Sequence, residues 1–122
     1  MSTLKVANLQ NTSSGAPTVK NSSGTEVGQF CKAWCNFQGT GTVSIRDSFN
    51  INSITDRGTG KYTLSFSSAM ANTNYASVFG ANANTAGYAG AETQNTGTLL
   101  CFGSYSGQFY DISIGNVAVF GD

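Results

Sequence analysis

The stretch SITDRGTGKYTLSF, residues 53–66, decides the fold of this chain. Its second half, KYTLSF, alternates polar and apolar residues, with Tyr62, Leu64 and Phe66 on one side. A period of two is the pattern of a strand with one buried face. Phe49 and Ile51, just before the stretch, alternate with polar residues in the same way. We therefore predict two strands joined by a hairpin connection over residues 56–60, where glycine supplies the positive φ that tight turns need.

The same stretch contains GTGK, which resembles the end of a phosphate-binding loop. Such a loop needs a glycine five places before its Gly-Lys pair and a Ser or Thr directly after the lysine. Thr55 and Tyr62 occupy those two positions here. The motif must also open a helix, whose N-terminus binds the anion, and the pattern that follows is that of a strand. The sequence therefore favours a turn over a nucleotide site.

Charge and composition narrow the classes of function. Charged residues make up 10% of the 122 residues, with six cationic and six anionic side chains and no histidine. About 25% is usual for soluble domains. There is no basic stripe, so we expect no nucleic-acid partner. Eight Phe, five Tyr and one Trp, set in alternating runs, argue against disorder. A surface of Ser, Thr, Asn and Gly suits β-structure and close contacts between subunits.

The rest of the chain reads as a succession of short strands separated by Gly, Asn and Ser turns. We expect strands at residues 30–37, 43–47, 49–54, 61–67, 75–79, 87–93, 99–103, 109–114 and 117–120. No stretch shows convincing helical periodicity, and the single proline, Pro17, lies outside these segments. The fold class we predict is all-β, an antiparallel β-sandwich or jelly-roll-like domain over residues 29–122.

Residues 1–28 differ from this domain because they lack aromatic residues and contain few aliphatic ones. A loose repeat, LQNTSSG at 9–15 and VKNSSG at 19–24, suggests short strands that are each followed by a turn. Such a segment cannot bury a core alone. We predict an extended N-terminal arm that lies against the main domain, against sister chains or against a docking partner; the alternative is a partly frayed terminus.

Residues 32–75 resemble a known domain family. The segments that carry the resemblance are KAWCNF at 32–37, GTGTVSIRDSFNINSITDRGTGKYTLSF at 39–66 and AMANTNY at 69–75. They are similar to the C-terminal domain of tail fibres and related virion proteins of tailed bacteriophages, especially marine and cyanobacterial phages. The arm, with LQNTSSG, also looks like the linker that precedes this domain in such fibres.

The resemblance implies a homotrimeric, all-β, non-enzymatic virion component that contacts the host surface. We therefore expect a short tail fibre or fibre tip, made in the host cytoplasm and assembled into the virion. Its expected partners are identical copies, other tail or capsid proteins bound through residues 1–28, and a host-surface glycan or protein. The chain shows neither a long shaft nor an evident virion-anchoring domain, so the alternative is a decoration protein of capsid or tail with a purely structural role.

We predict neither catalysis nor a cofactor. A glycosidase needs two carboxyl groups roughly 5–10 Å apart, but Asp47 and Asp56 fall beside predicted turns and are expected to brace them. Nor do the thiols indicate a metal site. Cys31 and Cys35 are roughly 13 Å apart along one strand face, too far for a disulfide, and three thiols without histidine are one ligand short for zinc. We expect Cys31, Cys35 and Cys101 to be small buried hydrophobes, and leave open whether Cys101 meets either of the others.

The N-terminus is polar by its third residue, and no apolar run approaches the roughly 20 residues of a membrane span. We therefore expect neither a signal peptide nor membrane insertion.

The longest stretch of small and polar residues, 80–97, is the predicted recognition site. Tyr88 lies among Gly87, Ala89 and Gly90, so its ring is expected to be accessible for stacking on a sugar; the alternative is that it packs inward. Trp34, the only tryptophan, is expected in the core or at a subunit contact. The residues predicted to bind the receptor are Asn82, Asn84, Thr85, Tyr88, Glu92 and Gln94, with Asn95 beside them.

Overall fold

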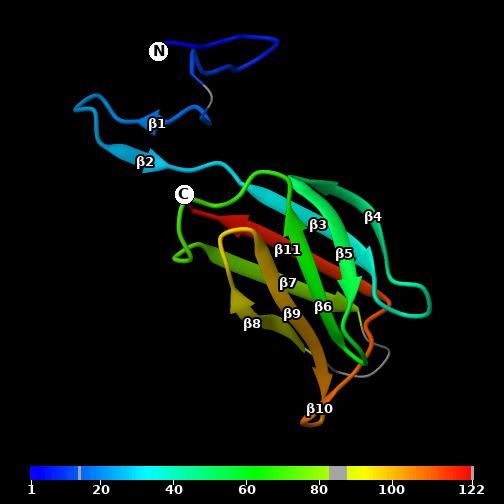
Figure 1. Ribbon diagram of the computed structural model, residues 1–122. Coiled ribbons are helices and arrows are strands. Elements are labelled where there is room, and N and C mark those ends of the chain that lie inside the picture. The colour runs from blue at the N-terminus through cyan, green and yellow to red at the C-terminus, as the bar shows by residue number, and fades with distance from the viewer. Residues whose placement is uncertain (14, 83–87, 122) are drawn as a thin grey trace. The chain divides into compact units, whose positions relative to one another are not determined.

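The computed structural model describes residues 1–13, 15–82 and 88–121 of the chain. It divides into two compact units, Met1–Phe30 and Cys31–Asp122 (Figure 1). Within the described residues every strand pairing is antiparallel and there is no helix. The prediction of an all-β, antiparallel chain is confirmed.

The first unit holds one short hairpin, in which β1 (Val19–Lys20) pairs with β2 (Glu26–Gly28). Asn21 organises its turn, because the side-chain Oδ1 accepts hydrogen bonds from the amides of Ser23 at 3.1 Å and Thr25 at 2.9 Å. The aliphatic side chains of this unit are all exposed: Leu4, Val6, Leu9, Val19 and Val27. The unit therefore buries no core of its own.

The second unit contains two sheets. The first sheet has the strand order β4-β3-β11-β7. Its strands are β3 (Ala33–Gln38), β4 (Ser44–Phe49), β7 (Ala76–Asn82) and β11 (Ile114–Phe120). The last strand of the chain thus lies between β3 and β7, so the pairing that closes this sheet joins residues far apart in sequence.

The second sheet is built around β9 (Thr98–Tyr105), which pairs with three strands. These are β6 (Lys61–Phe66), β8 (Tyr88–Gln94) and, at the end of β9, the short β10 (Gln108–Phe109). The remaining strand, β5 (Ile51–Asp56), pairs with β6.

One face of each sheet supplies the core. Every second side chain of β3 and of β6 is buried, as the alternation in AWCNFQ and KYTLSF predicts. The rings of Phe37 and Tyr62, one from each sheet, lie 5.1 Å apart between centroids. The two sheets therefore pack face to face over a single core. Its buried members are Ala33, Cys35, Phe37, Ile51, Tyr62, Leu64, Phe66, Met70, Tyr75, Leu99, Cys101, Ile112, Val117 and Val119.

The hairpin predicted over residues 56–60 is confirmed. The amide of Lys61 donates to the carbonyl of Gly58 at 3.0 Å, and Arg57 donates to Lys61 at 2.9 Å. Gly58 and Gly60 have φ of 111° and 67°, where glycine is favoured. Asp56 braces the turn through Oδ1, which accepts from the amide of Gly58 at 2.9 Å. GTGK is part of a turn between two strands.

Several predicted strand boundaries differ from those of the structure. The strands predicted at 109–114 and 117–120 are replaced by β10, which ends at Phe109, and by the unbroken β11, which begins at Ile114. Gly115 falls in the gap between these two predicted strands, but it lies within β11 opposite Phe37. A Cβ at this position would collide with the Phe37 ring, so the glycine serves close packing. The first strand of the domain also begins later than predicted, at Ala33.

Candidate functional site

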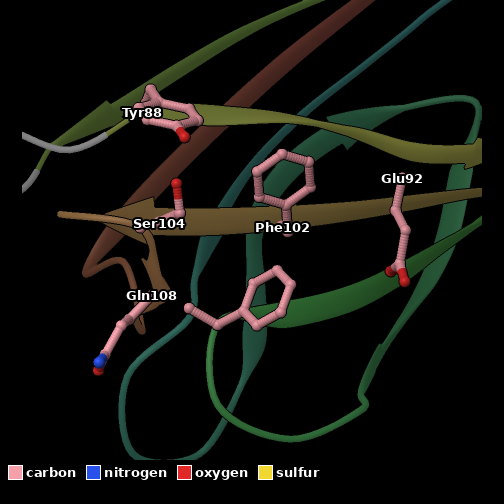
Figure 2. Close-up of a pocket in the computed structure, with 7 residues that line it drawn as sticks. Tyr88, Glu92, Phe102, Ser104 and Gln108 are labelled. Atoms are coloured by element: carbon pink, nitrogen blue, oxygen red, sulfur yellow. The ribbon is translucent and has the colours of Figure 1, made fainter.

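A shallow pocket of about 280 Å³ lies on the second sheet (Figure 2). We call it the aromatic pocket. It is lined by Tyr88, Glu92, Phe102, Ser104, Gly107, Gln108 and Phe109. These residues come from β8, β9 and β10 and the turn between the last two.

The alternation of side chains along β9 explains why Phe102 and Ser104 form the floor of the aromatic pocket. Leu99 and Cys101 of β9 point into the core, so Phe102 and Ser104 point to the opposite face of the sheet. Phe102 lies across from Gly90 of β8, where a Cβ would stand 3.4 Å from the ring. The glycine therefore gives the Phe102 ring room to lie against the neighbouring strand.

Two further rings flank Phe102. Tyr88 is 6.4 Å from it between centroids and Phe109 is 5.9 Å away, both nearly perpendicular at 80° and 82°. Such edge-to-face packing is favourable and orients the rings. Tyr88 nevertheless stays 62% exposed and Phe109 48% exposed. The pocket thus offers aromatic surface to solvent, and the predicted accessibility of Tyr88 is confirmed.

A tight turn brings Phe109 into position. Ser106 and Gly107 have φ of 49° and 79°. Two successive positive φ angles are typical of a type I′ hairpin turn. The turn folds the chain back so that Phe109 pairs with Ser104 of β9.

The hydroxyl of Ser104 is a buried polar group within the pocket. Ser104 is 6% exposed. In the described part of the chain its Oγ is buried and makes no hydrogen bond. Figure 2 shows the hydroxyl directed toward Tyr88. Because buried polar atoms nearly always have a partner, this hydroxyl marks a place where a ligand group or water is expected.

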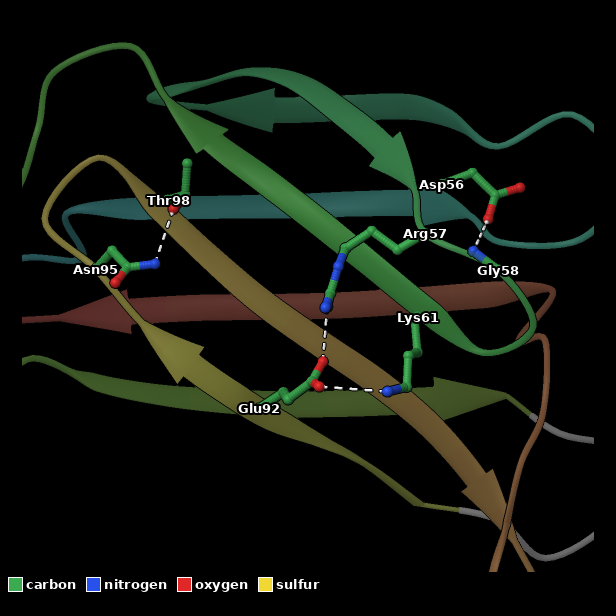
Figure 3. Close-up of polar contacts among 7 residues, drawn as sticks. All are labelled: Asp56, Arg57, Gly58, Lys61, Glu92, Asn95 and Thr98. Atoms are coloured by element: carbon green, nitrogen blue, oxygen red, sulfur yellow. Dashed lines mark hydrogen bonds and ion pairs between the residues drawn. The ribbon is translucent and has the colours of Figure 1, made fainter.

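Glu92, which lines the pocket, belongs to an ion cluster with Arg57 and Lys61 (Figure 3). Glu92 accepts from Arg57 Nη1 at 2.6 Å and from Lys61 Nζ at 3.3 Å. The hydrogen bond from Arg57, supported by Lys61, lowers the pKa of Glu92 below its ordinary value of 4.5. Lys61 Nζ also lies 4.3 Å from the centroid of the Phe109 ring. The carboxylate is therefore ionised at neutral pH and held in place.

Two of the residues predicted to bind a receptor, Tyr88 and Glu92, line the aromatic pocket. Three others make contacts within the chain instead. Asn82 accepts from Ser113 Oγ at 2.5 Å, Gln94 donates to the carbonyl of Tyr75 at 2.8 Å, and Asn95 donates to Thr98 Oγ1 at 3.2 Å. Asn84 and Thr85 lie outside the described residues.

Sequence reasoning missed Phe102, Ser104, Gln108 and Phe109. Two signals were available in the segment LCFGSYSGQF. Alternation around the apolar Cys101 places Phe102 and Ser104 on the opposite face, and Ser106-Gly107 has the composition of a two-residue turn. Neither signal shows that β8 lies beside them, because that pairing depends on the fold.

The outer face of the first sheet carries a second apolar surface. Phe49, Trp34, Ala118 and Val78 are in register across β4, β3, β11 and β7. We call these residues the apolar row. Trp34 is 38% exposed and Val78 60% exposed, so Trp34 lies outside the core. A neighbouring polar row includes Asn36, which donates to Asn116 at 2.5 Å.

Two carboxylates hold backbone amides of the hairpin between β5 and β6. Asp56 and Asp111 accept from the amides of Gly58 and Gly60, at 2.9 and 2.6 Å. No group of three or more potential metal ligands occurs among the residues with described positions.

The thiols are poor nucleophiles. Burial raises the pKa of Cys35 to about 11 and that of Cys101 to about 12, so both stay protonated at neutral pH. Both are buried, as predicted, whereas Cys31 is only partly buried; all three thiols are free, so Cys101 forms no disulfide with either of the others.

In the described ranges, no helix has the length and apolar character needed to cross a bilayer. Comparisons with protein-family models, with curated proteins and with solved structures found no match. No comparison tests the resemblance of residues 32–75 to phage fibre domains, so it serves only as a basis for proposals about function.

Proposed function

We propose that this chain is a bacteriophage virion protein, a short tail fibre or fibre tip, that attaches the particle to the host surface. One observation carries the attachment role. The aromatic pocket presents Tyr88 and Phe109 to solvent beside the fixed carboxylate of Glu92. Exposed rings next to a few placed polar groups are typical of recognition sites, and here they stand on paired strands.

Binding fits this site better than hydrolysis does. The pocket holds one carboxyl group, Glu92, and its pKa is lowered. A catalytic acid needs a raised pKa and a second carboxyl group across the sugar. Recognition requires only stacking area and hydrogen-bonding groups, which the pocket has.

We also propose that the protein acts as a homotrimer of packed-sheet domains, each a β-sandwich, and that residues 1–28 dock on another virion protein. The exposed aliphatic side chains of the first unit, such as Leu4 and Leu9, support a role in contacts between chains, because alone they bury nothing. The number three comes from the resemblance to phage fibres. A trimer would present three aromatic pockets at once and so raise the avidity for a repetitive surface.

The test is binding of the fluorescently labelled protein to a panel of bacterial strains, including the host of the phage that encodes it. We expect binding to the host, and competition with phage adsorption. Phe109→Ala should weaken binding at least about tenfold if the ring stacks on the receptor. Tyr110→Ala is a matched control, because Tyr110 is 52% exposed on the same hairpin but does not line the pocket.

The alternative is a decoration protein of the capsid or tail. The uncharged apolar row on the first sheet favours it, since such a surface suits a fixed contact in a protein lattice. Electron microscopy of virions would show whether the protein lies at the tail tip or on the shell. A shell position, with no binding to any host strain, would replace the attachment role by this one.

A further inference from the structure

We infer that the aromatic pocket binds a single uncharged acetamido sugar, an N-acetylated hexosamine unit of a surface glycan. The inference rests on the proposed attachment function and names the ligand class of its site. Four properties of the pocket lead to this inference: its size, its apolar lining, the hydroxyl of Ser104 that has no hydrogen-bond partner, and the pairing of Glu92 with Arg57 and Lys61.

The pocket is small and open. Its volume of about 280 Å³ lies just below the usual range of about 300–1,000 Å³ for ligand sites. A site of this size on a sheet surface holds one monosaccharide. The flanking ring of Phe109, which is 48% exposed, supplies stacking area for the C–H face of a pyranose.

The ligand group beside Ser104 must form a hydrogen bond with its hydroxyl and must also fit against the apolar residues around it. Phe102 and Phe109 line the space next to Ser104, whose Oγ has no partner. A plain sugar hydroxyl would bond to Oγ but would place further polar surface against the rings. An acetamido group brings both parts, a carbonyl that accepts from the Ser104 hydroxyl and a methyl group that lies against the rings.

Access to the hydroxyl requires one local motion. The Ser104 hydroxyl is directed toward Tyr88 (Figure 2). Tyr88 is 62% exposed, so its side chain can change rotamer on a picosecond to nanosecond timescale. The ligand then takes the place of the ring beside Oγ.

The charges favour a neutral ligand. The described residues that line the pocket include no cation, and the nearby Arg57 and Lys61 are both paired with Glu92. A ligand carboxylate would have to enter beside the ionised Glu92, which repels it. Glu92 and Gln108 can instead bond the ring hydroxyls of a neutral sugar, Glu92 as acceptor and Gln108 as donor or acceptor.

One sugar unit in a shallow site binds weakly. A monosaccharide in such a site is expected to have a Kd of about 1 mM or weaker. Useful attachment then depends on many copies acting together, as the proposed trimer provides.

The experiment is NMR titration of the uniformly ¹⁵N-labelled chain with the methyl glycosides of N-acetylglucosamine, N-acetylgalactosamine, glucose and glucuronic acid. We expect the two acetamido sugars to shift the amide signals of Phe102, Ser104 and Phe109, and the other two sugars to leave them unchanged. Ser104→Ala should weaken binding about tenfold, because it removes one hydrogen bond in an apolar site. Tyr110→Ala is the control and should bind as the wild type does.

The outcomes separate this inference from the proposed function. Equal shifts with glucose, or unchanged binding in Ser104→Ala, would overturn the acetamido assignment. If the wild type and Phe109→Ala attach equally well to host cells and no sugar shifts the pocket signals, the ligand assignment fails while host attachment stands. If acetamido sugars bind as described but no strain binds the protein, the ligand assignment is supported and the attachment role fails.

Discussion

The hydroxyl of Tyr62, on β6 of the second sheet, donates a hydrogen bond to the carbonyl of Gly39, 3.0 Å away at the end of β3 in the first sheet. The same hydroxyl accepts from the amide of Ile112 at 3.2 Å. The side chain of Tyr62 is completely buried. One core residue therefore connects both sheets through apolar packing and also satisfies two backbone groups that would otherwise lack a partner.

Tyr62→Phe is expected to lower the free energy of unfolding by about 1–3 kcal/mol, because a buried carbonyl and a buried amide lose their partner. Chemical denaturation followed by fluorescence measures this change. Tyr88→Phe is the matched control: Tyr88 is exposed, so loss of its hydroxyl should leave stability unchanged. A Tyr62→Phe variant as stable as the wild type would mean that the hydroxyl is not needed to join the sheets.

Gly60→Ala should destabilise the hairpin between β5 and β6. Gly60 has φ of 67°, and a Cβ there would stand 2.5 Å from the amide nitrogen of Tyr110. Backbone strain and the collision together are expected to cost more than about 1 kcal/mol. Gly97→Ala is the control, because Gly97 has open space around its Cβ position. Thermal unfolding of both variants tests this, and equal melting temperatures would contradict it.

The sequence was sufficient for what depends on local alternation. The period of two in KYTLSF and AWCNFQ correctly assigned the buried faces of β6 and β3. The glycines at 58 and 60 correctly marked a turn, because the positive φ that they adopt is a local property. Asp56 was correctly expected to brace that turn.

What depends on long-range pairing was not predictable. Gly115 falls between two predicted strands, but its role follows from contact with Phe37, a residue of the distant strand β3. The aromatic pocket was missed in part for the same reason. Tyr88 and Glu92 were identified within one segment, whereas Phe102 and Phe109 join them only through the pairing of β8, β9 and β10. The contact of Glu92 with Arg57 likewise joins residues from separate hairpins.

Acid should weaken the ion cluster at the aromatic pocket. The pKa of Glu92 is lowered in the folded chain by the hydrogen bond from Arg57 and by Lys61. A lowered pKa stabilises the fold above the unfolded-state value of 4.5, and this contribution disappears as the pH falls through the folded value. We expect a small decrease in melting temperature below about pH 4.5, larger in the wild type than in Glu92→Gln. Identical acid profiles of the two proteins would show that the pairs contribute nothing.

Alkali should destabilise the core. Burial raises the pKa of Cys101 from 9.0 to about 12, that of Cys35 from 9.0 to about 11 and that of Tyr62 from 10.0 to about 12. The raised values mean that the stabilisation from keeping these groups neutral is complete below about pH 9 and is lost as the pH rises through the folded-state values. Urea unfolding between pH 7 and pH 11 should show a falling stability above about pH 9. Cys101→Ala should flatten this slope, although its stability at pH 7 will be lower; a profile as steep as the wild type would contradict the assignment.

We expect the chain to self-associate through the outer face of the first sheet, because this face is large and its apolar row carries no charge. Four strands at about 4.8 Å spacing and seven residues at about 3.3 Å make a face of about 20 Å by 20 Å. Because side chains project from the sheet, the accessible surface of this face is larger than its flat area. It is a large part of the area of about 800 Å² that each partner buries in a standard interface. The apolar row crosses the whole width of the face without a charged residue. A second copy of the chain presents the same apolar row, and covering this row desolvates no charge; Asp47, on the same face beside Asn36, lies in the neighbouring polar row.

Val78→Lys should therefore shift the protein toward monomer, because it places a charge in the apolar row at its β7 end. Val78 is 60% exposed, so the fold itself should tolerate the lysine. Thr55→Lys is the matched control, since it adds the same charge to an exposed position on β5 of the other sheet. Sedimentation velocity over a concentration series measures the change. A wild type that stays monomeric at every concentration would exclude self-association, and a Val78→Lys protein that self-associates as strongly as Thr55→Lys would place the contact between copies elsewhere on the chain.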